Sequence, residues 1–485
     1  MTELIDFGLI VLVVAVGFLL MLLSTKVTER VPIPAPAIFL LAAALASDLF
    51  PSLAEHTSIR TVERIGVVAI ILILFDGGMK VGWRRFRGSA APITALGVVG
   101  TFATAGAMAV FAHAFFDFGW TTAWILGAAL APTDPAVMFS VLGNREVGGR
   151  SGTILEGESG ANDPVGIALV IGMLEFATHE DASLWGIVGD FAVEMAVGLA
   201  IGAVGAAALL RLMRISLPSE SLYAIRMLVA AAVLYGVATI AHGSGFLAVF
   251  VAGLLLGDAR APFKREIERF QGAMASVAEI TVFAALGLTF HFRDLGREGI
   301  WLDGILLALL LGLVARPLVV AVLLAPIRLR WAERAFIGWG GLKGAVPILL
   351  ATFALLEGLD EGVRIYNLVV VVVMVSVLTQ GSTIPFAARR LGIPIRVEEI
   401  TPYSLTVELQ EEPEGVLRYR VAAGSHAADR RVRDLQIGDS TWISLIVRDG
   451  VPIQPRGSSR VREGDEVLVL TNPADEPIVR RVFEG

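Results

Sequence analysis

The sequence predicts an all-α polytopic membrane protein that ends in a small α+β domain. Of its 485 residues, 55% are hydrophobic and only 18% are charged, and its mean hydropathy is +0.73. A soluble domain averages about 25% charged residues. The apolar residues fall in runs of about 20, the length that spans a hydrocarbon core of ~30 Å. These observations disfavour a large soluble protein built from buried helices.

Thirteen apolar segments are candidates for membrane-spanning helices, although the ninth is short for a full crossing. The first segment lacks a basic start and continues directly into the second, so we interpret it as a retained helix. Because the chain has no cysteine, disulfides and thiolate metal sites are excluded. The expected limits are 5–24, 33–50, 64–80, 90–112, 119–142, 154–175, 185–210, 222–241, 245–257, 271–291, 299–325, 335–357 and 365–387.

The loops between these segments alternate in positive charge. One set of loops holds 20 lysines and arginines, whereas the opposite set holds five. Loops rich in lysine and arginine stay on the cytoplasmic side of a membrane. We therefore expect the N-terminus outside and the C-terminus in the cytoplasm, as an odd number of spans requires.

The chain becomes polar after its last expected span. We expect a transmembrane domain at 1–390, a linker at 391–403 and a cytoplasmic α+β domain at 404–485. Alternating apolar residues argue against a disordered tail, and Asp449-Gly450 is typical of a hairpin turn. The expected tail elements are strands at 404–410, 416–423, 442–447 and 467–470, a short amphipathic stretch at 426–437 and a helix at 476–484.

Two prolines interrupt the fifth segment, which contains Pro132-Thr133-Asp134-Pro135. An ionisable group inside a span costs roughly 2.5–3.5 kcal/mol on the insertion scale, so its default interpretation is functional. The prolines remove backbone donors and clash with the preceding turn, so the helix should break and expose carbonyl oxygens beside Asp134. Carbonyl and carboxylate oxygens suit a hard cation. The alternative is a simple proline kink with a surface aspartate.

The sixth segment opens with a polar run, ESGANDP, from Glu158 to Pro164. Residues four apart share a helix face, so Glu158 aligns with Asn162. Ser159 aligns with Asp163 in the same way, and this second pair offers a hydroxyl and a carboxylate to a cation. Pro164 should loosen the local hydrogen bonding. A capping motif would explain Glu158 and Ser159 in a first turn, but not the polar pair deeper in the helix.

The twelfth segment contains GGLKGAVP, in which three glycines and a proline surround Lys343. This composition again predicts a broken helix. Broken helices at corresponding places in two halves of a chain indicate an inverted-repeat transporter. We therefore expect segments one to six and eight to thirteen to form two inverted six-helix repeats, in which the two discontinuous helices cross. Lys343 is expected to balance half-helix ends that face each other at this crossing.

Other charged residues also fall within the spans. Arg316 lies mid-span and requires an acidic partner, because an unpaired buried guanidinium is not tolerated. Glu158 is the best candidate, with Asn162 alongside, and we assign this group a structural role. Asp76, toward the cytoplasmic end of the third segment, either lines the ion path or is a boundary residue whose side chain snorkels. The intramembrane acids without an assigned role are Glu194 and Glu279.

At these residues the chain resembles the cation:proton antiporter family of the sodium/proton exchanger type, the CPA1 branch. The resemblance covers about residues 1–390 and is specific, because four motifs occur together. It implies a homodimer in a bacterial inner membrane that transports K⁺ or Na⁺ and H⁺ and needs no cofactor. The motifs are Thr133-Asp134-Pro135, Glu158-Ser159 with Asn162-Asp163, Arg316-Pro317, and Gly341-Leu342-Lys343-Gly344.

The same resemblance implies roles for individual residues. Asp163 would exchange cation and proton, while Glu158 and Asn162 would engage Arg316. Lys343 departs from the family, whose members usually carry arginine there, so the charge is kept but the bidentate geometry is not. The residues implied to bind the monovalent cation are Asp163, Asp134, Ser159 and the Thr133 backbone, and Asp76 matches an acid of some relatives.

The tail resembles the C-terminal ligand-binding domain of potassium-conductance regulators, called RCK_C or TrkA_C. An antiporter with this module resembles a bacterial potassium/proton antiporter subgroup, which places K⁺ ahead of Na⁺. A small ligand or nucleotide at this domain would regulate transport; the alternative is a dimerisation and stability module. We expect membrane lipid around the spans and no nucleic-acid partner. The matching residues are Gly424-Ser425, Leu435, Arg448-Asp449-Gly450, Pro455 and Gly464-Asp465.

These features predict a secondary antiporter, not an enzyme. Cation and proton are expected to compete for Asp163 and to exchange by alternating access. Because Asn162 supplies no second titrating carboxylate beside Asp163, we expect electroneutral one-for-one exchange. The alternative is a tail-regulated potassium channel or uptake subunit, although the chain contains no carbonyl filter loop such as TVGYG. An intramembrane hydrolase would need a base for Ser159, and no histidine within a span supplies one.

Overall fold

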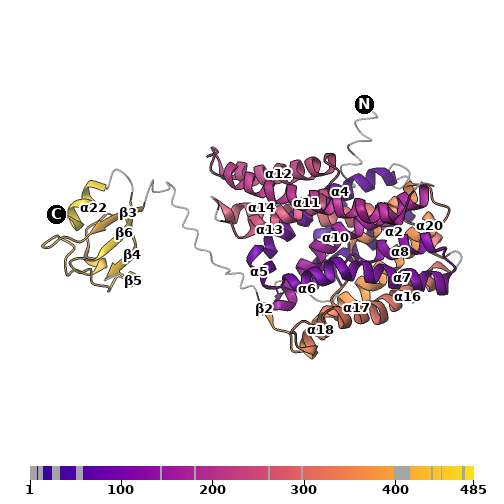
Figure 1. Cartoon of the computed structure of the whole chain (residues 1–485). Helices are drawn as coiled ribbons and strands as arrows, with labels where there is room; N and C mark the ends of the chain where they lie inside the picture. The colour runs from indigo at the N-terminus through magenta and orange to yellow at the C-terminus, as the bar shows by residue number, and fades with distance from the viewer. Residues whose placement is uncertain are drawn as a thin grey trace. The chain divides into compact units, whose positions relative to one another are not determined.

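The computed structural model divides into two compact units, Met1–Glu399 and Ile400–Gly485, each described by itself. Figure 1 shows helices building the first unit, and strands together with the helix α22 building the second. The expected strand 404–410 and much of the first expected span lie outside the described residues. The structure describes residues 8, 12, 15–23, 33–50, 58–142, 145–179, 182–259, 261, 263–296, 299–397, 416–438, 441–448, 451–471 and 476–485.

Within the described part of the first unit, seven helical stretches have the length and composition to cross a membrane. Four shorter apolar helices accompany them. The long stretches are Ala90–Phe116, Arg150–Thr178, Leu184–Leu212, Ser221–Ile240, Lys264–Gly287, Ile300–Leu323 and Gly362–Arg390, and the shorter helices are Ala35–Leu49, Trp120–Leu130, Gly245–Gly257 and Ala345–Leu356.

Helix starts follow local sequence signals. Ser58, Ser183 and Ser244 each accept a backbone N–H at the beginning of a helix, which satisfies a donor that has no partner in the first turn. The first-unit helices are α2 (Ala35–Leu49), α4 (Ile59–Val81), α5 (Trp83–Gly88), α6 (Ala90–Thr94), α7 (Thr101–Phe116), α8 (Trp120–Leu130), α9 (Pro135–Leu142), α10 (Arg150–Thr178), α11 (Leu184–Leu212), α12 (Glu220–Ile240), α13 (Gly245–Gly257), α14 (Lys264–Gly287), α15 (Phe292–Leu295), α16 (Ile300–Leu310), α17 (Arg316–Leu323), α18 (Trp331–Trp339), α19 (Ala345–Leu356), α20 (Gly362–Val375) and α21 (Ser382–Arg390).

Three π-helical stretches continue helices of this unit: η1 (Ala95–Gly100), η2 (Leu311–Ala315) and η3 (Ser376–Gly381). The sequence analysis did not predict them. Stretches of this kind are rare and occur frequently at functional sites.

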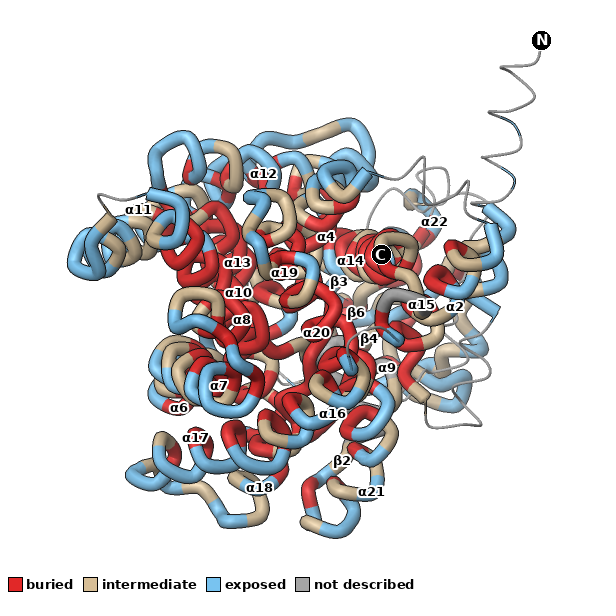
Figure 2. The backbone as a smooth tube through the Cα atoms, turned by 90° about the vertical axis from the view of Figure 1, so that its right-hand side faces the viewer, coloured by how far each residue is buried: buried red, intermediate tan, exposed pale blue. Residues whose placement is uncertain are grey.

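The core of the first unit lies around α8, α10, α13 and α20, where buried residues concentrate (Figure 2). α13 packs against α4 and α11, and α19 packs against α20, α8 and α4. α11 and α12 instead expose apolar side chains such as Val188, Val204 and Val233. A helix that is apolar on its exposed face matches a lipid environment better than an aqueous one.

In its described residues, the second unit is an antiparallel sheet with one α-helix. Its strands are β3 (Val416–Arg420), β4 (Trp442–Arg448), β5 (Val451–Ile453) and β6 (Glu466–Leu470), in the order β3-β6-β4-β5, and its helix is α22 (Glu476–Phe483). Val479, Val482 and Phe483 bury one face of α22 against the sheet core. The sequence analysis missed β5. The amphipathic stretch 426–437 forms turns and one short 3-10 helix, η4 (Val432–Asp434).

A two-stranded antiparallel ribbon in the first unit was also not predicted. It consists of β1 (Arg145–Val147), between α9 and α10, and β2 (Ile395–Val397), which follows α21. Glu146 pairs with Arg396 in its register. Part of the segment expected to be a linker therefore belongs to the helical unit.

Candidate functional site

Two interrupted helices meet inside the first unit. α8 ends at Leu130 and α9 begins at Pro135, while α18 ends at Trp339 and α19 begins at Ala345. Between these ends, the Asp134 backbone N–H donates to the carbonyl oxygen of Leu342 at 2.8 Å. The proline pair and the glycine run that predicted the breaks thus lie in direct contact.

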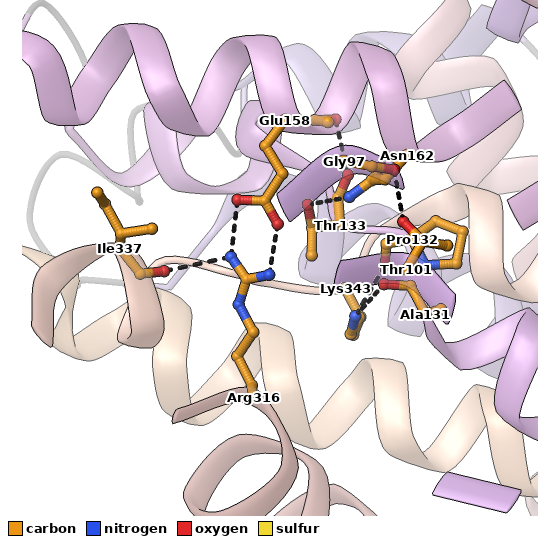
Figure 3. A network of polar contacts seen from close by, with 11 residues as sticks. Gly97, Thr101, Ala131, Pro132, Thr133, Glu158, Asn162, Arg316, Ile337 and Lys343 are labelled. Atoms are coloured by element: carbon orange, nitrogen blue, oxygen red, sulfur yellow. Dashed lines mark hydrogen bonds and ion pairs between the residues drawn. The ribbon is translucent and has the colours of Figure 1, made fainter. Parts of the chain in front are cut away.

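Lys343, from the second break, contacts the first break (Figure 3). It is fully buried, and its Nζ donates to the carbonyl oxygens of Ala131 at 2.8 Å and Pro132 at 2.9 Å. Carbonyls at the end of a helix have no intrahelical partner and carry partial negative charge. The Lys343 ammonium therefore donates the hydrogen bonds that carbonyl oxygens at the end of α8 would otherwise lack. A Cβ at Gly344 would collide with the Asp134 carboxylate, so only glycine allows this approach.

α10 binds the first break through two polar side chains. Ser159 Oγ donates to the Thr133 carbonyl oxygen at 2.7 Å. Asn162 Nδ2 donates to Thr133 Oγ1 at 2.8 Å. The hydroxyl of Ser159 keeps its own lone pairs after donating its proton. Oxygen atoms from α10 and from the unwound backbone thus converge on one place.

Asp163 lies next to this group, with a relative exposure of 5%. Its Oδ1 has no hydrogen-bond partner among the residues that the structure describes. Asp134 and Lys343 are close enough to act on it electrostatically. A buried carboxylate requires compensation of its charge. A bound cation or a bound proton would each supply it.

Glu158 and Arg316 form a buried ion pair across α10 and α17. Arg316 contacts both carboxylate oxygens, Nη2 donating to Oε2 at 2.8 Å, and it also donates to the Ile337 carbonyl (Figure 3). A Cβ at Gly341 would lie 2.5 Å from Arg316 Nε, which explains this glycine. Two parallel hydrogen bonds make this pair strong and geometrically specific.

The structure places Asn162 differently from the prediction. Asn162 bonds Thr133, and neither its oxygen nor Arg316 Nε has a hydrogen-bond partner in the described chain. The reason is geometric: Glu158 binds the guanidinium with both oxygens, so the amide faces the unwound segment instead. The spacing of residues along α10 could not by itself predict which group the Asn162 side chain binds.

Asp76 forms its ion pair within its own helix, α4, and not with the group around Thr133. It is buried near the end of α4, and its ion pair is with Lys80 Nζ at 2.7 Å. The Lys80 side chain is 65% exposed. Asp76 therefore lies between an exposed cation and the interior of the unit.

Ser376 and Gln380 are polar residues of the site that the sequence analysis missed. Ser376 Oγ accepts the Lys343 N–H at 3.1 Å and lies 2.7 Å from Gln380 Oε1, to which it donates. Both residues are buried and lie in η3. Their presence in an otherwise apolar span was a usable signal, because buried polar groups in a membrane are costly.

The sequence matches known families over most of its length. Residues 8–390 match the family model described as "Sodium/hydrogen exchanger, transmembrane". The chain belongs to this exchanger family. It is a multi-pass membrane cation/proton antiporter and not an enzyme, which confirms the predicted family and class of function. Residues 416–483 match the TrkA-C domain, which also confirms the predicted tail module.

The chain is also similar in sequence to individual cation/proton antiporters. The chain is 32% identical over 452 residues to the K(+)/H(+) antiporter NhaP2 of Shewanella sp. (strain MR-4), covering 92% of this chain and 78% of that protein. It is 31% identical over 485 residues to the K(+)/H(+) antiporter NhaP of Alkalimonas amylolytica, covering 98% and 83%.

The fold of the exchanger-family unit is similar to a solved structure. The sodium proton antiporter MjNhaP1 from Methanocaldococcus jannaschii superposes with a TM-score of 0.68 at 21% identity, covering 80% of this chain and 99% of that chain. This likeness establishes the fold. The mostly helical membrane unit and the small strand-containing tail thus agree with the predicted architecture at this level.

Proposed function

We propose that this antiporter exchanges K⁺ for H⁺, one for one, and that the two ions compete for Asp163. The observation that carries the proposal is the buried Asp163 carboxylate, whose Oδ1 lacks a hydrogen-bond partner in the described chain, beside an unwound helix. The negative form requires a cation, and the neutral form requires a proton. One buried carboxylate cannot hold both at once.

The oxygen atoms around Asp163 suit a monovalent cation. Asp134 would supply a second carboxylate, Ser159 its hydroxyl and Thr133 its carbonyl oxygen, and the last two are already joined by a 2.7 Å hydrogen bond. These are the hard oxygen ligands that such cations prefer. When Asp163 is protonated, the attraction for the cation weakens and the cation leaves.

The proposed stoichiometry rests on Asn162. This residue is an amide that donates to Thr133, so it adds no titrating group beside Asp163. In this proposal Asp134 only ligates the cation, and Asp163 alone alternates between one proton and one monovalent cation, so no net charge moves over a full cycle. The exchange is therefore electroneutral.

The architecture of the cycle is part of the same proposal. Of thirteen spans, one to six and eight to thirteen form two inverted six-helix repeats, and the interrupted pairs α8–α9 and α18–α19 cross at the site. Alternating access moves this site between the two sides of a bacterial inner membrane, with the N-terminus outside and the tail in the cytoplasm. Asp76 lines the cytoplasmic approach, and the protein works as a homodimer surrounded by lipid.

K⁺ is preferred over Na⁺ in this proposal for two reasons. The similar proteins of Shewanella and Alkalimonas amylolytica are named K(+)/H(+) antiporters. The tail matches the TrkA-C domain, and an antiporter with this module resembles a potassium/proton antiporter subgroup. The module also suggests regulation by a bound ligand. We place a small regulatory ligand or nucleotide at the tail, with dimerisation and stability as its alternative role.

A flux assay in proteoliposomes tests the proposal. A pH-sensitive dye inside the vesicles is monitored while K⁺, Na⁺, Rb⁺ and Li⁺ are titrated separately. We expect saturable proton flux that half-saturates at the lowest concentration with K⁺ and does not change with membrane voltage. Voltage-dependent flux would contradict one-for-one exchange, and a lower half-saturating concentration for Na⁺ would contradict the K⁺ assignment.

A further inference from the structure

α14 carries an acid that the proposed ion site does not use. Glu279 lies in the second half of this helix, and its Oε1 is buried without a hydrogen-bond partner in the described residues. A carboxylate inside a membrane span is expensive and usually marks an ion path or a proton relay. Asp134 and Lys80 act on it electrostatically.

The same face of α14 leads from Asp76 toward the site. α14 packs along α4, and it also contacts α19. A Cβ at Gly272 would lie 3.8 Å from Asp76 Oδ1. Glu279 follows Gly272 by seven residues, about two helical turns, so both residues lie on one face. This face therefore runs from the Asp76–Lys80 ion pair to Glu279.

Few other charges face Glu279 from the elements packed against α14. α19 has no charged residue, and α2 has only Asp48, which binds His291 and the N–H of Phe292. On α12, Arg226 donates to the carbonyl oxygens of Leu212 and Ile215, and Glu220 is the first residue of the helix. α4, which packs along α14, carries Arg60, Glu63 and Arg64 in its first two turns and Asp76 and Lys80 toward its end. Of the charges on these elements, Lys80 acts on Glu279, and Asp134 acts on it from the first helix break.

We propose that Glu279 binds the cation or the proton in transit between Asp76 and Asp134. This inference rests on the proposed antiport at Asp163. It adds Glu279 to Asp76 as a second carboxylate on the cytoplasmic path to that site. A carboxylate oxygen without a protein partner is free to contact a passing cation or to accept a proton. Its negative charge also raises the cation concentration near the site.

Substitution of Glu279 tests this role in full-length protein. We expect Glu279→Gln to raise the half-saturating cation concentration about tenfold, or to move the pH profile down by about one unit. The profile moves down because loss of a negative charge favours the proton-free form of neighbouring carboxylates. Glu279→Asp should keep the half-saturating cation concentration and the pH profile close to those of the wild type. Glu194→Gln, an intramembrane control on α11, should leave both quantities unchanged.

A chemical measurement on the wild-type protein covers the case in which Glu279→Gln does not fold. A carbodiimide labels protonated buried carboxyl groups, and mass spectrometry locates the adduct. We expect labelling of Glu279 at low pH that K⁺ suppresses. An unlabelled Glu279, or a Gln variant with wild-type saturation and pH profile, would overturn the inference. Exchange lost in Asp163→Asn but unchanged in Glu279→Gln would overturn this inference alone.

The ribbon of β1 and β2 carries a second inference independently. The Gly148 N–H donates to the Pro394 carbonyl oxygen at 2.7 Å, next to the pairs Val147↔Ile395 and Glu146↔Arg396. Hydrogen-bonded and non-hydrogen-bonded pairs alternate in an antiparallel ladder. Val147 and Ile395 are therefore a non-hydrogen-bonded pair, the kind in which the side chains lie closest.

The ribbon connects the site to the chain segment that enters the tail. Val147 is buried, and a Cβ at Gly152 would collide with its carbonyl oxygen, so β1 packs on the first turn of α10. Glu158 follows six residues later on that helix. On the other strand, β2 ends at Val397, close to the end of the first unit at Glu399.

We infer that the ribbon transmits the state of the tail to the start of α10. This inference rests on the regulatory role proposed for the tail. A pull or twist on β2 acts through backbone hydrogen bonds on β1, and β1 is continuous in sequence with α10. The helix that carries Ser159 and Asp163 would then shift relative to the unwound segment.

A disulfide across the ribbon tests the inference, because the chain contains no other cysteine. The Val147→Cys/Ile395→Cys pair should cross-link reversibly, since a non-hydrogen-bonded pair fits disulfide geometry. In the reduced state, deletion of residues 400–485 should change the half-saturating cation concentration by at least about fivefold. In the oxidised state this difference should disappear. Each single-cysteine variant controls for oxidation itself.

Three results would overturn this second inference. The cysteines could fail to cross-link, the deletion could have no effect in reduced protein, or the effect could persist after oxidation. Exchange by the reduced full-length variant shows that antiport itself is intact. A failure of the ribbon is therefore distinguishable from a failure of the proposed function.

Discussion

Asp134 donates its backbone N–H to the carbonyl oxygen of Leu342, and this 2.8 Å bond joins the two helix breaks. Each break thus supplies a partner for a backbone group that the other break exposes. Lys343, the residue after Leu342, adds two hydrogen bonds to the end of α8. A substitution at either break should therefore disturb the structure of both breaks.

Replacing Lys343 should damage both stability and transport. Lys343→Met leaves the carbonyl oxygens of Ala131 and Pro132 buried without their charged donor, and each lost bond to a charged group costs about 1.5–3 kcal/mol. Lys343→Arg keeps the charge and should retain part of the exchange. Thermal unfolding in detergent and proteoliposome flux check both variants. Full exchange by Lys343→Met would show that the ammonium is dispensable.

The Glu158–Arg316 pair should behave as one structural unit. Removing either partner of a buried pair strands the other charge and costs about 3–5 kcal/mol. We expect Glu158→Gln and Arg316→Met each to lower the unfolding temperature strongly. The double variant should be less destabilised than the sum of the two, which a double-mutant cycle measures. Strictly additive losses would contradict a direct pair.

Ser159 should contribute to cation affinity and not only to the fold. Ser159→Ala removes the hydroxyl that donates to the Thr133 carbonyl oxygen. We expect the half-saturating K⁺ concentration to rise about tenfold, the equivalent of ~1.4 kcal/mol. Ser151→Ala, a buried serine in the first turn of α10, is the matched control. Equal effects of the two substitutions would argue against a specific role for Ser159.

The tail should lose stability in acid because of Asp465. Burial alone would raise the pKa of Asp465, but hydrogen bonds from the Arg448 side chain and the Arg462 N–H outweigh it and lower the pKa below its usual value. The stabilisation is therefore present above the unfolded-state pKa of about 3.9 and is lost as the pH falls through the folded-state pKa. Asp465→Asn should destabilise the tail at neutral pH.

Hydrogen exchange of β6 in the full-length protein measures this effect. The exposed neighbour Glu463→Gln is the control, and its protection should match the wild type. Unchanged protection of β6 in Asp465→Asn would show that the ion pair of Asp465 with Arg448 does not stabilise the tail.

Much of the site was predictable because membrane burial makes polar residues conspicuous. Prolines at 132 and 135 and the glycines around Lys343 marked both breaks, since these residue types disrupt helices by themselves. The requirement that Arg316 find an acid pointed to Glu158, and the two are paired in the structure.

Other parts depend on contacts that no local pattern records. Asn162 bonds Thr133 because the unwound segment passes beside α10. Ser376 meets Lys343 only because η3 packs there. β1, β2 and β5 are each three residues long, so they carry too little periodicity to be recognised. Their pairing is a tertiary contact.

Competition of K⁺ and H⁺ for Asp163 is tested most directly by replacing this residue with asparagine, which removes the charge and keeps the size. Proteoliposomes with Asp163→Asn are compared with wild type and with Asp190→Asn, an exposed acid on α11. We predict no K⁺-driven proton flux from Asp163→Asn at any pH, with wild-type flux from Asp190→Asn. Substantial K⁺/H⁺ exchange by a folded Asp163→Asn protein would contradict this prediction.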